Sequence, residues 1–268
     1  MLAGLLAHAA AVADIDADEA CRRISDKLAS VSLAECRAAR LSETGHHSVN
    51  GFPILMREYP PLGERRPRAR VLLVGGTHGD ELASISVVFK WMQTLNEHHS
   101  GLFHWHVIPL MNPDGALIPE QSRGNANGVD LNRNFESHDP ELSPLEYWHQ
   151  NTYRNPRRYP GHKPLSEPET RWLKQEIGRF RPDVIIAVHA PYHLVDFDAP
   201  DRANAPERIG HLYKNLMGTY PGSLGNYAGM QLGIPVITLE LQHAGIMPTP
   251  GEISQIWVDL VRWLIGNT

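Results

Sequence analysis

Residues 71–95 read VLLVGGTHGDELASISVVFKWMQTL, and this stretch decides the fold class. Its first part, VLLVGG (71–76), is a β-branched apolar run that ends in glycines, which is typical of a buried strand. Its last part, LASISVVFKWMQTL (82–95), has apolar residues at helical spacing. A buried strand that leads directly into a helix predicts one unit of a parallel sheet.

Further strands and helices alternate along the chain. A helix is expected over 166–180, which begins with a Ser-x-x-Glu capping box and has Pro168 near its first turn, and an amphipathic helix over 252–266 closes the chain. Buried strands are expected at HWHVIPLM (104–111), DVIIAVHA (183–190) and VITLEL (236–241). The predicted fold class is therefore α/β, with a mixed, mostly parallel sheet and helices on both faces.

The other segments give weaker signals. Residues 17–40 are predicted to be helical, with Asp16 or Asp18 able to cap the start. A short extended piece follows around 53–59. The segment 136–165 is rich in Pro, His, Asn and Tyr, so we expect a long loop with little regular structure.

Length and composition indicate one soluble domain. The 268 residues fit a single structural domain, in which residues 1–60 form a helical and extended segment packed on the core and residues 61–268 hold the chemistry. Hydrophobic residues make up 42% and charged residues 21%, and the net charge is −5. We expect no nucleic-acid partner because no basic stripe is present, and no membrane span because no apolar run approaches about 20 residues.

The first 13 residues, MLAGLLAHAAAVA, have two interpretations. They have the short apolar core and small residues of a signal peptide, but no Lys or Arg precedes Arg22. They are either a signal remnant or the start of an alanine-rich helix. Cys21 and Cys36 either form one disulfide in an oxidising compartment or remain buried thiols in the cytosol. The location is therefore open, and the cytoplasm is slightly favoured over the periplasm.

Polar side chains stand at the carboxyl ends of three predicted strands. His78 and Glu81 follow the first strand, His189 ends the strand 183–190, and Glu240 lies near the end of VITLEL. In α/β sheets, ligands bind beyond the carboxyl ends of the strands. A catalytic zinc takes three nitrogen or oxygen ligands and leaves one position for water. His78, Glu81 and His189 are therefore a candidate metal site, and Gly79 lets the turn bring its ligands together.

The remaining histidines, from a total of 15, carry less information. His104 and His106 share one face of a strand by period-two spacing, but no third donor is in evident reach. His138, His149 and His162 lie in the long loop, where they could rim a cleft. We interpret most of the histidines as solvated surface groups.

The segments NPDG (112–115) and RGNANGVDLNRNF (123–135) complete the pattern. The first is typical of a turn after a strand. The second places Arg123, Asp130 and Arg133 close in sequence. Guanidinium groups bind carboxylates and stabilise developing oxyanions, and a carboxylate can hold the second ring nitrogen of a metal-bound histidine.

From about residue 71 to residue 241 the sequence resembles the carboxypeptidase A superfamily of zinc peptidases. The matching motifs occur in the family's order: H-x-x-E, N-P-D-G, R-x-N-x-x-G-V-D-L-N-R-N-F, a distant His after a strand, and T-L-E-L. The resemblance implies a zinc carboxypeptidase-like fold and a metallocarboxypeptidase that uses one zinc ion.

The resemblance also implies roles for single residues. His78, Glu81 and His189 match the zinc ligands, and Glu240 matches the general base. Arg123 matches the arginine that polarises the scissile carbonyl. Asn132 and Arg133 match the pair that binds a substrate carboxylate. Asp130 matches the hydrogen-bond partner of the first zinc histidine.

Within the superfamily, the compact length and the segments SEPET (166–170), HAP (189–191) and GSLGNYAG (222–229) resemble bacterial murein tripeptide amidases. That resemblance implies a small peptide substrate with a free carboxylate, cut between γ-D-glutamate and meso-diaminopimelate. Tyr220 and Tyr227 are candidates for a substrate-binding tyrosine. The oligomeric state stays open.

Two alternatives remain at this point. An N-acyl amino-acid deacylase of the succinylglutamate desuccinylase or aspartoacylase type shares H-G-x-E and D-L-N-R, but N-P-D-G favours a peptidase. A non-catalytic module that holds zinc and binds cell-wall peptides should have lost the base or the arginine, and both Glu240 and Arg123 are present.

Overall fold

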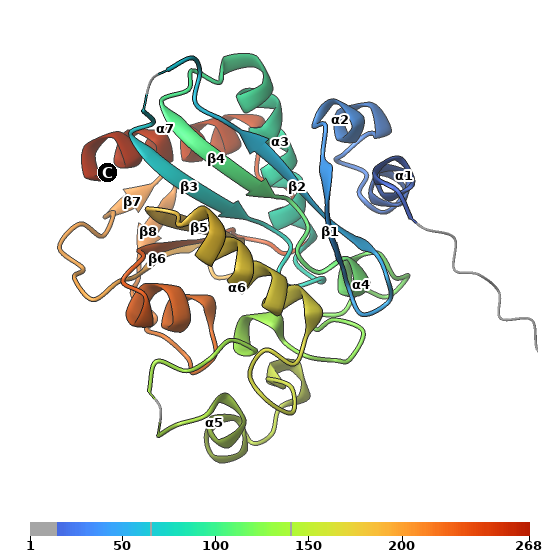
Figure 1. The fold of residues 1–268 in the computed structure, drawn as a ribbon, viewed down its shortest axis with the longest axis vertical. Coiled ribbons are helices and arrows are strands. Elements are labelled where there is room, and N and C mark those ends of the chain that lie inside the picture. Colours follow the sequence, from blue (N-terminus) through green and yellow to red (C-terminus); the bar gives the residue numbers. More distant parts are fainter. Residues whose placement is uncertain (1–14, 65, 140) are drawn as a thin grey trace, which may run out of the picture.

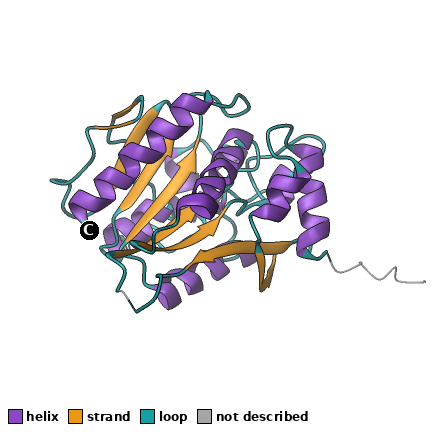
Figure 2. Cartoon of the chain, turned by 90° about the horizontal axis from the view of Figure 1, so that it is seen from above, coloured by secondary structure: helices purple, strands orange, loops and turns teal. Residues whose placement is uncertain are grey.

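A mixed β-sheet runs through the middle of the molecule, and helices cover both of its faces (Figures 1 and 2). The computed structural model describes residues 15–64, 66–139 and 141–268. The first 13 residues, whose interpretation the sequence left open, lie outside the described residues. Among the residues described, no helix is long and apolar enough to cross a bilayer.

Within the described residues, the strands form one nine-stranded sheet in the order β1-β2-β4-β3-β5-β9-β6-β8-β7. The central neighbours β4, β3, β5 and β9 are parallel to one another, and β2 and β6 flank them in antiparallel orientation. The strands are β1 Ser42–His47, β2 Pro53–Tyr59, β3 Ala69–Val74, β4 Phe103–Ile108, β5 Val184–His189, β6 Leu194–Asp198, β7 Arg208–Ile209, β8 Leu212–Lys214 and β9 Val236–Glu240. The predicted α/β class and the mixed sheet are confirmed, with the parallel strands at its centre.

Each face of the sheet has its own apolar cluster. Helix α6 packs through Trp172 and Ile177 on the face that carries Leu72 and Ile185. Helices α3 and α7 pack on the opposite face. The α-helices are α1 Ala17–Lys27, α2 Leu33–Ala38, α3 Leu82–His98, α4 Pro113–Ala116, α5 Pro144–Asn151, α6 Pro168–Phe180 and α7 Pro250–Asn267. Two short 3₁₀ helices, η1 Leu131–Arg133 and η2 Pro156–Arg158, and one π-helix, η3 Gly225–Gln231, lie between them.

Two local expectations are wrong. The segment 136–165 contains helix α5, which Ser143 starts with a capping box to Glu146. The sequence Ser143-Pro-Leu-Glu146 carries that signal inside a polar stretch. The capping box predicted for α6 does not form, because the helix begins at Pro168 and the Ser166 hydroxyl donates to the Glu167 carboxylate instead.

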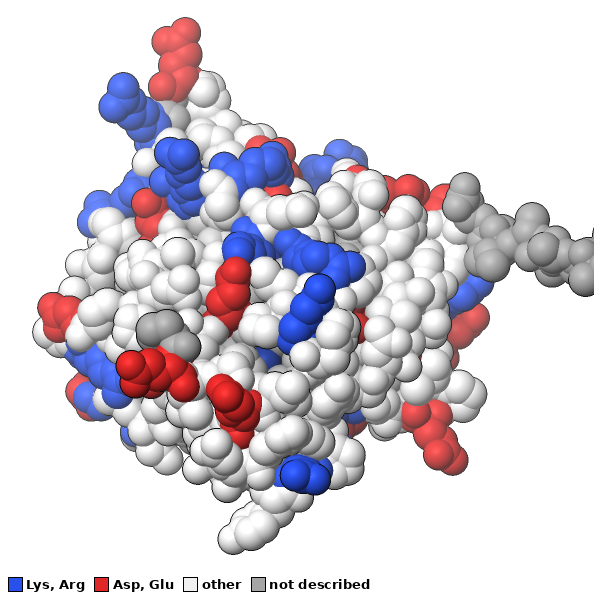
Figure 3. Space-filling view, turned by 60° about the horizontal axis from the view of Figure 1, so that its bottom comes forward, with Lys and Arg blue, Asp and Glu red and all other residues white. Residues whose placement is uncertain are grey.

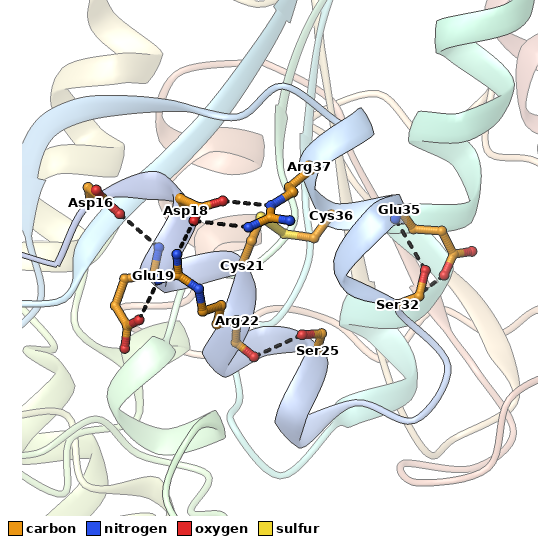
Figure 4. Close-up of a disulfide and its surroundings, with 10 residues drawn as sticks. All are labelled: Asp16, Asp18, Glu19, Cys21, Arg22, Ser25, Ser32, Glu35, Cys36 and Arg37. Atoms are coloured by element: carbon orange, nitrogen blue, oxygen red, sulfur yellow. Dashed lines mark hydrogen bonds and ion pairs between the residues drawn. A yellow bond between two sulfur atoms is a disulfide. The ribbon is translucent and has the colours of Figure 1, made fainter.

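Helices α1 and α2 are joined by a disulfide between Cys21 and Cys36 (Figure 4). Asp16 caps α1 by accepting a hydrogen bond from the Glu19 backbone amide. The Arg37 guanidinium of α2 donates to Asp18 of α1, so an ion pair lies beside the disulfide. Of the two states considered for the cysteines, the structure has the bonded one.

Candidate active site

The carboxyl ends of β3, β5 and β9 meet at one edge of the sheet and form one wall of a cavity of about 530 Å³. His189 and Glu240 are the last residues of their strands and are paired in parallel register. His78 and Glu81 lie in the turn after β3, before α3 begins at Leu82. The sheet topology brings these four side chains together, as the sequence predicted.

His78, Glu81 and His189 bring three donor groups to one point. The His78 Nδ1 atom lies 2.8 Å from Glu81 Oε1 and 3.1 Å from His189 Nδ1, and His189 Nδ1 lies 3.0 Å from Glu81 Oε2. All three side chains are buried. Two imidazole nitrogens and a carboxylate at these spacings form a donor set that suits zinc.

Gly79 explains how the turn holds two of these donors. A Cβ atom at this position would lie 2.2 Å from the Gly115 carbonyl carbon and 2.5 Å from the Ala116 nitrogen. Both atoms belong to the backbone of α4, in the NPDG segment. Glycine therefore lets the chain between His78 and Glu81 pack directly against α4.

Asp130 holds the second ring nitrogen of His78. Its Oδ1 atom lies 3.0 Å from His78 Nε2, and its Oδ2 atom accepts a 2.9 Å hydrogen bond from Arg123 Nε. Burial alone would raise the pKa of Asp130, but the charges of Arg123 and His78 hold that pKa well below its ordinary value. The charged Asp130 therefore orients His78 so that Nδ1 faces Glu81 and His189.

Glu240 is buried beside the cluster and faces the cavity. Burial raises its pKa, and the neighbouring His189 only partly opposes this effect. Its Oε2 atom accepts a long hydrogen bond of 3.4 Å from the Tyr192 backbone amide. A carboxylate with a raised pKa and few hydrogen bonds is well suited to accept and return a proton.

Arg123, Asn132 and Arg133 also line the cavity. The Arg123 guanidinium reaches Glu81 with a 3.3 Å contact from Nη1. The Asn132 side-chain oxygen accepts a hydrogen bond from the Leu224 backbone amide, which fixes the orientation of the Asn132 side chain. In the view of Figure 3, which brings the α5 end of the molecule forward, Lys and Arg side chains gather near the middle of the face.

The structure separates the two candidate tyrosines. Tyr220 lines the cavity, and the Arg133 guanidinium carbon lies 4.5 Å from the centre of its ring. Tyr227 is buried in the α6-side cluster and stacks on Phe135 with ring centres 5.5 Å apart. Unlike Tyr220, Tyr227 does not line the cavity, because its ring is part of the apolar packing.

Sequence reasoning missed two acidic residues of the cavity, Asp196 and Asp198 on β6. Both are buried, and Asp198 Oδ1 has no hydrogen-bond partner within the described part of the chain. Burial, reinforced by the charge of Asp196, raises the pKa of Asp198 to about 7. Two aspartates at period-two spacing in the apolar strand LVDFD are the signal that was available.

Known proteins are similar to this chain over most of its length. Residues 28–208 match the family described as zinc carboxypeptidase. Murein peptide amidase A of Escherichia coli K12 is 31% identical over 223 residues, which are 81% of this chain and 87% of that protein. The enzyme of the same name from Vibrio campbellii is 31% identical over 72% of this chain and 76% of its own length.

Solved structures share the fold. The murein-tripeptide amidase of Escherichia coli O157 superposes with a TM-score of 0.58 at 25% identity, over 84% of this chain and 91% of that one. Carboxypeptidase A of Helicoverpa armigera superposes with a TM-score of 0.66 over 94% of this chain and 73% of that one. At 15% identity, the second match supports the fold alone.

Proposed function

The chain belongs to the zinc carboxypeptidase family of hydrolases, and from that premise we propose that it cuts the amide bond between γ-D-glutamate and meso-diaminopimelate in murein peptides. The proposal assigns one zinc ion to His78, Glu81 and His189. Asp130 orients His78 for this role. The murein amidases of Escherichia coli and Vibrio campbellii support the substrate class by their similarity over most of the chain.

The chemistry follows from the charged groups around the cavity. A bound zinc ion would polarise the scissile carbonyl and acidify a water molecule. Glu240 accepts the water's proton and returns it to the leaving amine, as its raised pKa favours. The Arg123 guanidinium stabilises the charge that develops on the carbonyl oxygen. Because water is the nucleophile, no covalent enzyme intermediate is needed.

Asn132 and Arg133 are proposed to hold the carboxylate beside the scissile bond. The Arg133 guanidinium is the cation of this pair, and Tyr220 covers it with its ring. A guanidinium binds a carboxylate through two parallel hydrogen bonds, which fixes the position of the amide relative to Glu240. Arg157 and Arg158 line the same cavity and favour an acidic peptide.

The observation that carries the substrate assignment is the pair Asp196 and Asp198 in the same cavity as Arg133. Diaminopimelate has a carboxylate next to the scissile amide, and its far end carries an ammonium group beside a second carboxylate. Arg133 suits the carboxylate next to the amide, and the buried carboxylates suit the distal ammonium group. A purely apolar side chain would leave Asp198 without a partner, which costs free energy in a buried site.

One assay distinguishes the candidate functions. The zinc-loaded protein is incubated separately with L-Ala-γ-D-Glu-meso-diaminopimelate, a dipeptide with a hydrophobic C-terminal residue, and N-succinylglutamate. We expect release of diaminopimelate and little turnover of the other two. Turnover of succinylglutamate alone would indicate the deacylase alternative, and binding without turnover would indicate the non-catalytic module.

The variant Glu240→Gln tests the proposed base in the same assay. The amide cannot take up the water's proton, so we expect kcat to fall by about 100- to 10,000-fold. Zinc content should stay at the wild-type level because the substitution leaves the three donors intact. Near-normal turnover would remove Glu240 from the mechanism.

We also propose that the protein works in an oxidising compartment. The Cys21–Cys36 disulfide supports this location, because disulfides persist outside the reducing cytosol. The sequence slightly favoured the cytoplasm, and the disulfide is the reason for proposing a different location. Alkylation of protein taken directly from its host, followed by mass measurement, should find both cysteines protected; two alkylated thiols would contradict the proposal.

A further inference from the structure

We propose that Glu58, His104 and His106 form a second metal site, separate from the catalytic cavity, that binds zinc or a similar divalent transition-metal ion. His104 and His106 lie on β4 and Glu58 on the neighbouring strand β2, and none of the three lines the cavity. The cavity opens at the carboxyl ends of the parallel strands, whereas His104 lies near the amino end of β4.

The antiparallel pairing of β2 with β4 supplies the donor that the two histidines lacked in sequence. Glu58 is the register partner of His106, so the two side chains stand on the same face of the sheet. His104 stands two residues away from His106 on that same face. A carboxylate from β2 therefore meets two imidazoles from β4.

The donor atoms are close enough for one ion to bind all three. Glu58 Oε1 lies 2.8 Å from His104 Nε2 and 3.7 Å from His106 Nε2. All three donor atoms lie within 4.8 Å of one another, as do those of the catalytic cluster. Ligand atoms of a tetrahedral zinc with bonds of about 2.1 Å are about 3.4 Å apart, so small side-chain movements complete the site.

His106 is already oriented as a metal ligand. Its Nδ1 atom lies 2.5 Å from the carboxylate oxygen Glu176 Oε1, and Arg179 in turn donates to both oxygens of Glu176. Phe180 stacks on the His106 ring with centres 3.6 Å apart. Because Nδ1–H donates to a carboxylate, the lone pair of the neutral ring is on Nε2, as in carboxylate–histidine–metal arrangements.

The Nε2 atom of His106 is the atom that would bind the metal ion. The residue is 2% exposed, and Nε2 has no hydrogen-bond partner among the residues that the structure describes. A buried nitrogen without a partner is costly, and either a metal ion or a proton would remove that cost. Two imidazoles and one carboxylate suit zinc better than magnesium or calcium, which prefer oxygen donors.

The site is accessible from solvent on one side. The Glu58 side chain is 51% exposed and that of His104 is 20% exposed, so an ion can enter and water can complete its coordination. Strands β1 and β2 form a hairpin at the edge of the sheet, and β2 joins this hairpin to β4. A bound ion would therefore attach this hairpin to the parallel part of the sheet.

The test counts zinc ions per chain by equilibrium dialysis at micromolar free zinc and neutral pH, followed by elemental analysis of the full-length, untagged protein. The site variant is Glu58→Gln with His104→Asn, both partly exposed and so compatible with folding. The matched control is Glu97→Gln with His98→Asn, an exposed pair at the end of α3 whose Glu97 Oε2 and His98 Nε2 lie 3.6 Å apart.

We expect two zinc ions in the wild type and in the control, and one in the site variant with peptidase activity unchanged. A His78→Ala, His189→Ala variant should still bind one ion at this site, which makes the result independent of the catalytic assignment. One ion in the wild type, or equal loss in the site variant and the control, would overturn the proposal. The first result means that a proton satisfies His106, and the second means adventitious binding.

Discussion

The orientation of the His78 ring is set by contacts at both of its nitrogens. Nδ1 faces Glu81 and His189, while Nε2 faces Asp130. Asp130 is fully buried and is also the partner of Arg123, so one carboxylate positions both a proposed zinc ligand and the proposed oxyanion-stabilising cation. The positions of His78 and Arg123 therefore depend on hydrogen bonds to Asp130, a residue that need not contact the substrate.

The substitution Asp130→Asn tests that dependence. The amide keeps the shape but loses the negative charge that orients His78 and Arg123. We expect zinc affinity to fall about 10- to 100-fold, the usual effect of removing the carboxylate partner of a ligating histidine. Competition with a chromogenic chelator measures the change. An unchanged affinity would mean that the His78 ring is held by its other contacts.

The substitution Asp198→Asn tests the proposed ammonium pocket. A hydrogen bond between charged groups contributes about 1.5–3 kcal/mol, so kcat/KM for the diaminopimelate peptide should fall about 10- to 100-fold. The same peptide ending in 2-aminopimelate, which keeps the distal carboxylate but lacks the distal ammonium group, is the control and should not lose rate. Equal losses for both peptides would show that Asp198 acts on folding or on the reaction itself.

The raised pKa of Asp198 gives this pocket a pH dependence. Below a pH of about 7 the carboxyl becomes protonated in the free enzyme and no longer attracts an ammonium group. The ratio of kcat/KM for the diaminopimelate peptide to that for the 2-aminopimelate peptide should therefore fall from pH 8 to pH 5. In Asp198→Asn the ratio should stay flat, since no proton is exchanged at that position.

Stability should change in the matching direction. The folded protein prefers protonated Asp198, because its pKa of about 7 lies above the ordinary value of 3.8. This contribution to stability is present in acid and is lost as the pH rises through about 7. The Tm of Asp198→Asn relative to the wild type should consequently increase between pH 5 and pH 8.

At the scale of elements, the turn between β3 and α3 is held by contact with α4. Gly79 touches the α4 backbone so closely that the turn and the NPDG segment are one packed unit. The Asn112 side chain caps α4 and also donates to the Arg123 carbonyl oxygen, which links this unit to the segment that carries Asp130. Three motifs separated in sequence are therefore held together, two by close backbone packing at Gly79 and the third by the Asn112 side chain.

The substitution Gly79→Ala should disturb this unit. The new methyl group would lie within 2.5 Å of backbone atoms. Because these atoms belong to the backbone, no side-chain rotation can relieve the clash. We expect a loss of about 1–3 kcal/mol in stability from overpacking, together with weaker zinc binding as His78 and Glu81 separate. Chemical denaturation and zinc titration measure the two effects.

Gly178→Ala is the matched control for that variant. Gly178 lies inside α6, and an added Cβ meets no atom within 4 Å. Alanine there should raise stability by about 0.5–1 kcal/mol, because glycine is the poorer helix former, and should leave zinc binding unchanged. Similar behaviour of the two variants would contradict the role given to close packing at Gly79.

At the scale of the whole molecule, the three proposed zinc donors connect elements that are distant in sequence. The segment after β3 and the end of β5 are 111 residues apart at His78 and His189. An ion held by both stabilises the folded chain, since the unfolded chain does not form the site. Metal binding and global stability are therefore coupled.

Removal of zinc should lower the Tm of the protein. A ligand at 100 times its Kd stabilises the folded state by about 2.7 kcal/mol, so chelation should produce a shift of several degrees. Calorimetry with and without a chelator measures it, and added zinc should restore the Tm whereas magnesium should not. His189→Ala should show a smaller shift; an equal shift would place the stabilising ion elsewhere.

The sequence by itself determined much of the architecture and the centre of the candidate site. Buried strands such as 71–76 are visible because their apolar runs and glycine ends are local features. His78, Glu81, His189 and Glu240 could be placed together because parallel strands end at the same edge of a sheet. That rule needs only the order of the elements.

Only the tertiary structure decided the features that depend on which strands and helices become neighbours. Glu58 meets His104 and His106 through the pairing of β2 with β4, and the cysteines meet through the packing of α1 on α2. Tyr220 faces the cavity, whereas Tyr227 enters the core. Local periodicity tells which residues share a face of one element, but register and packing between elements arise from long-range contacts that the local pattern does not encode.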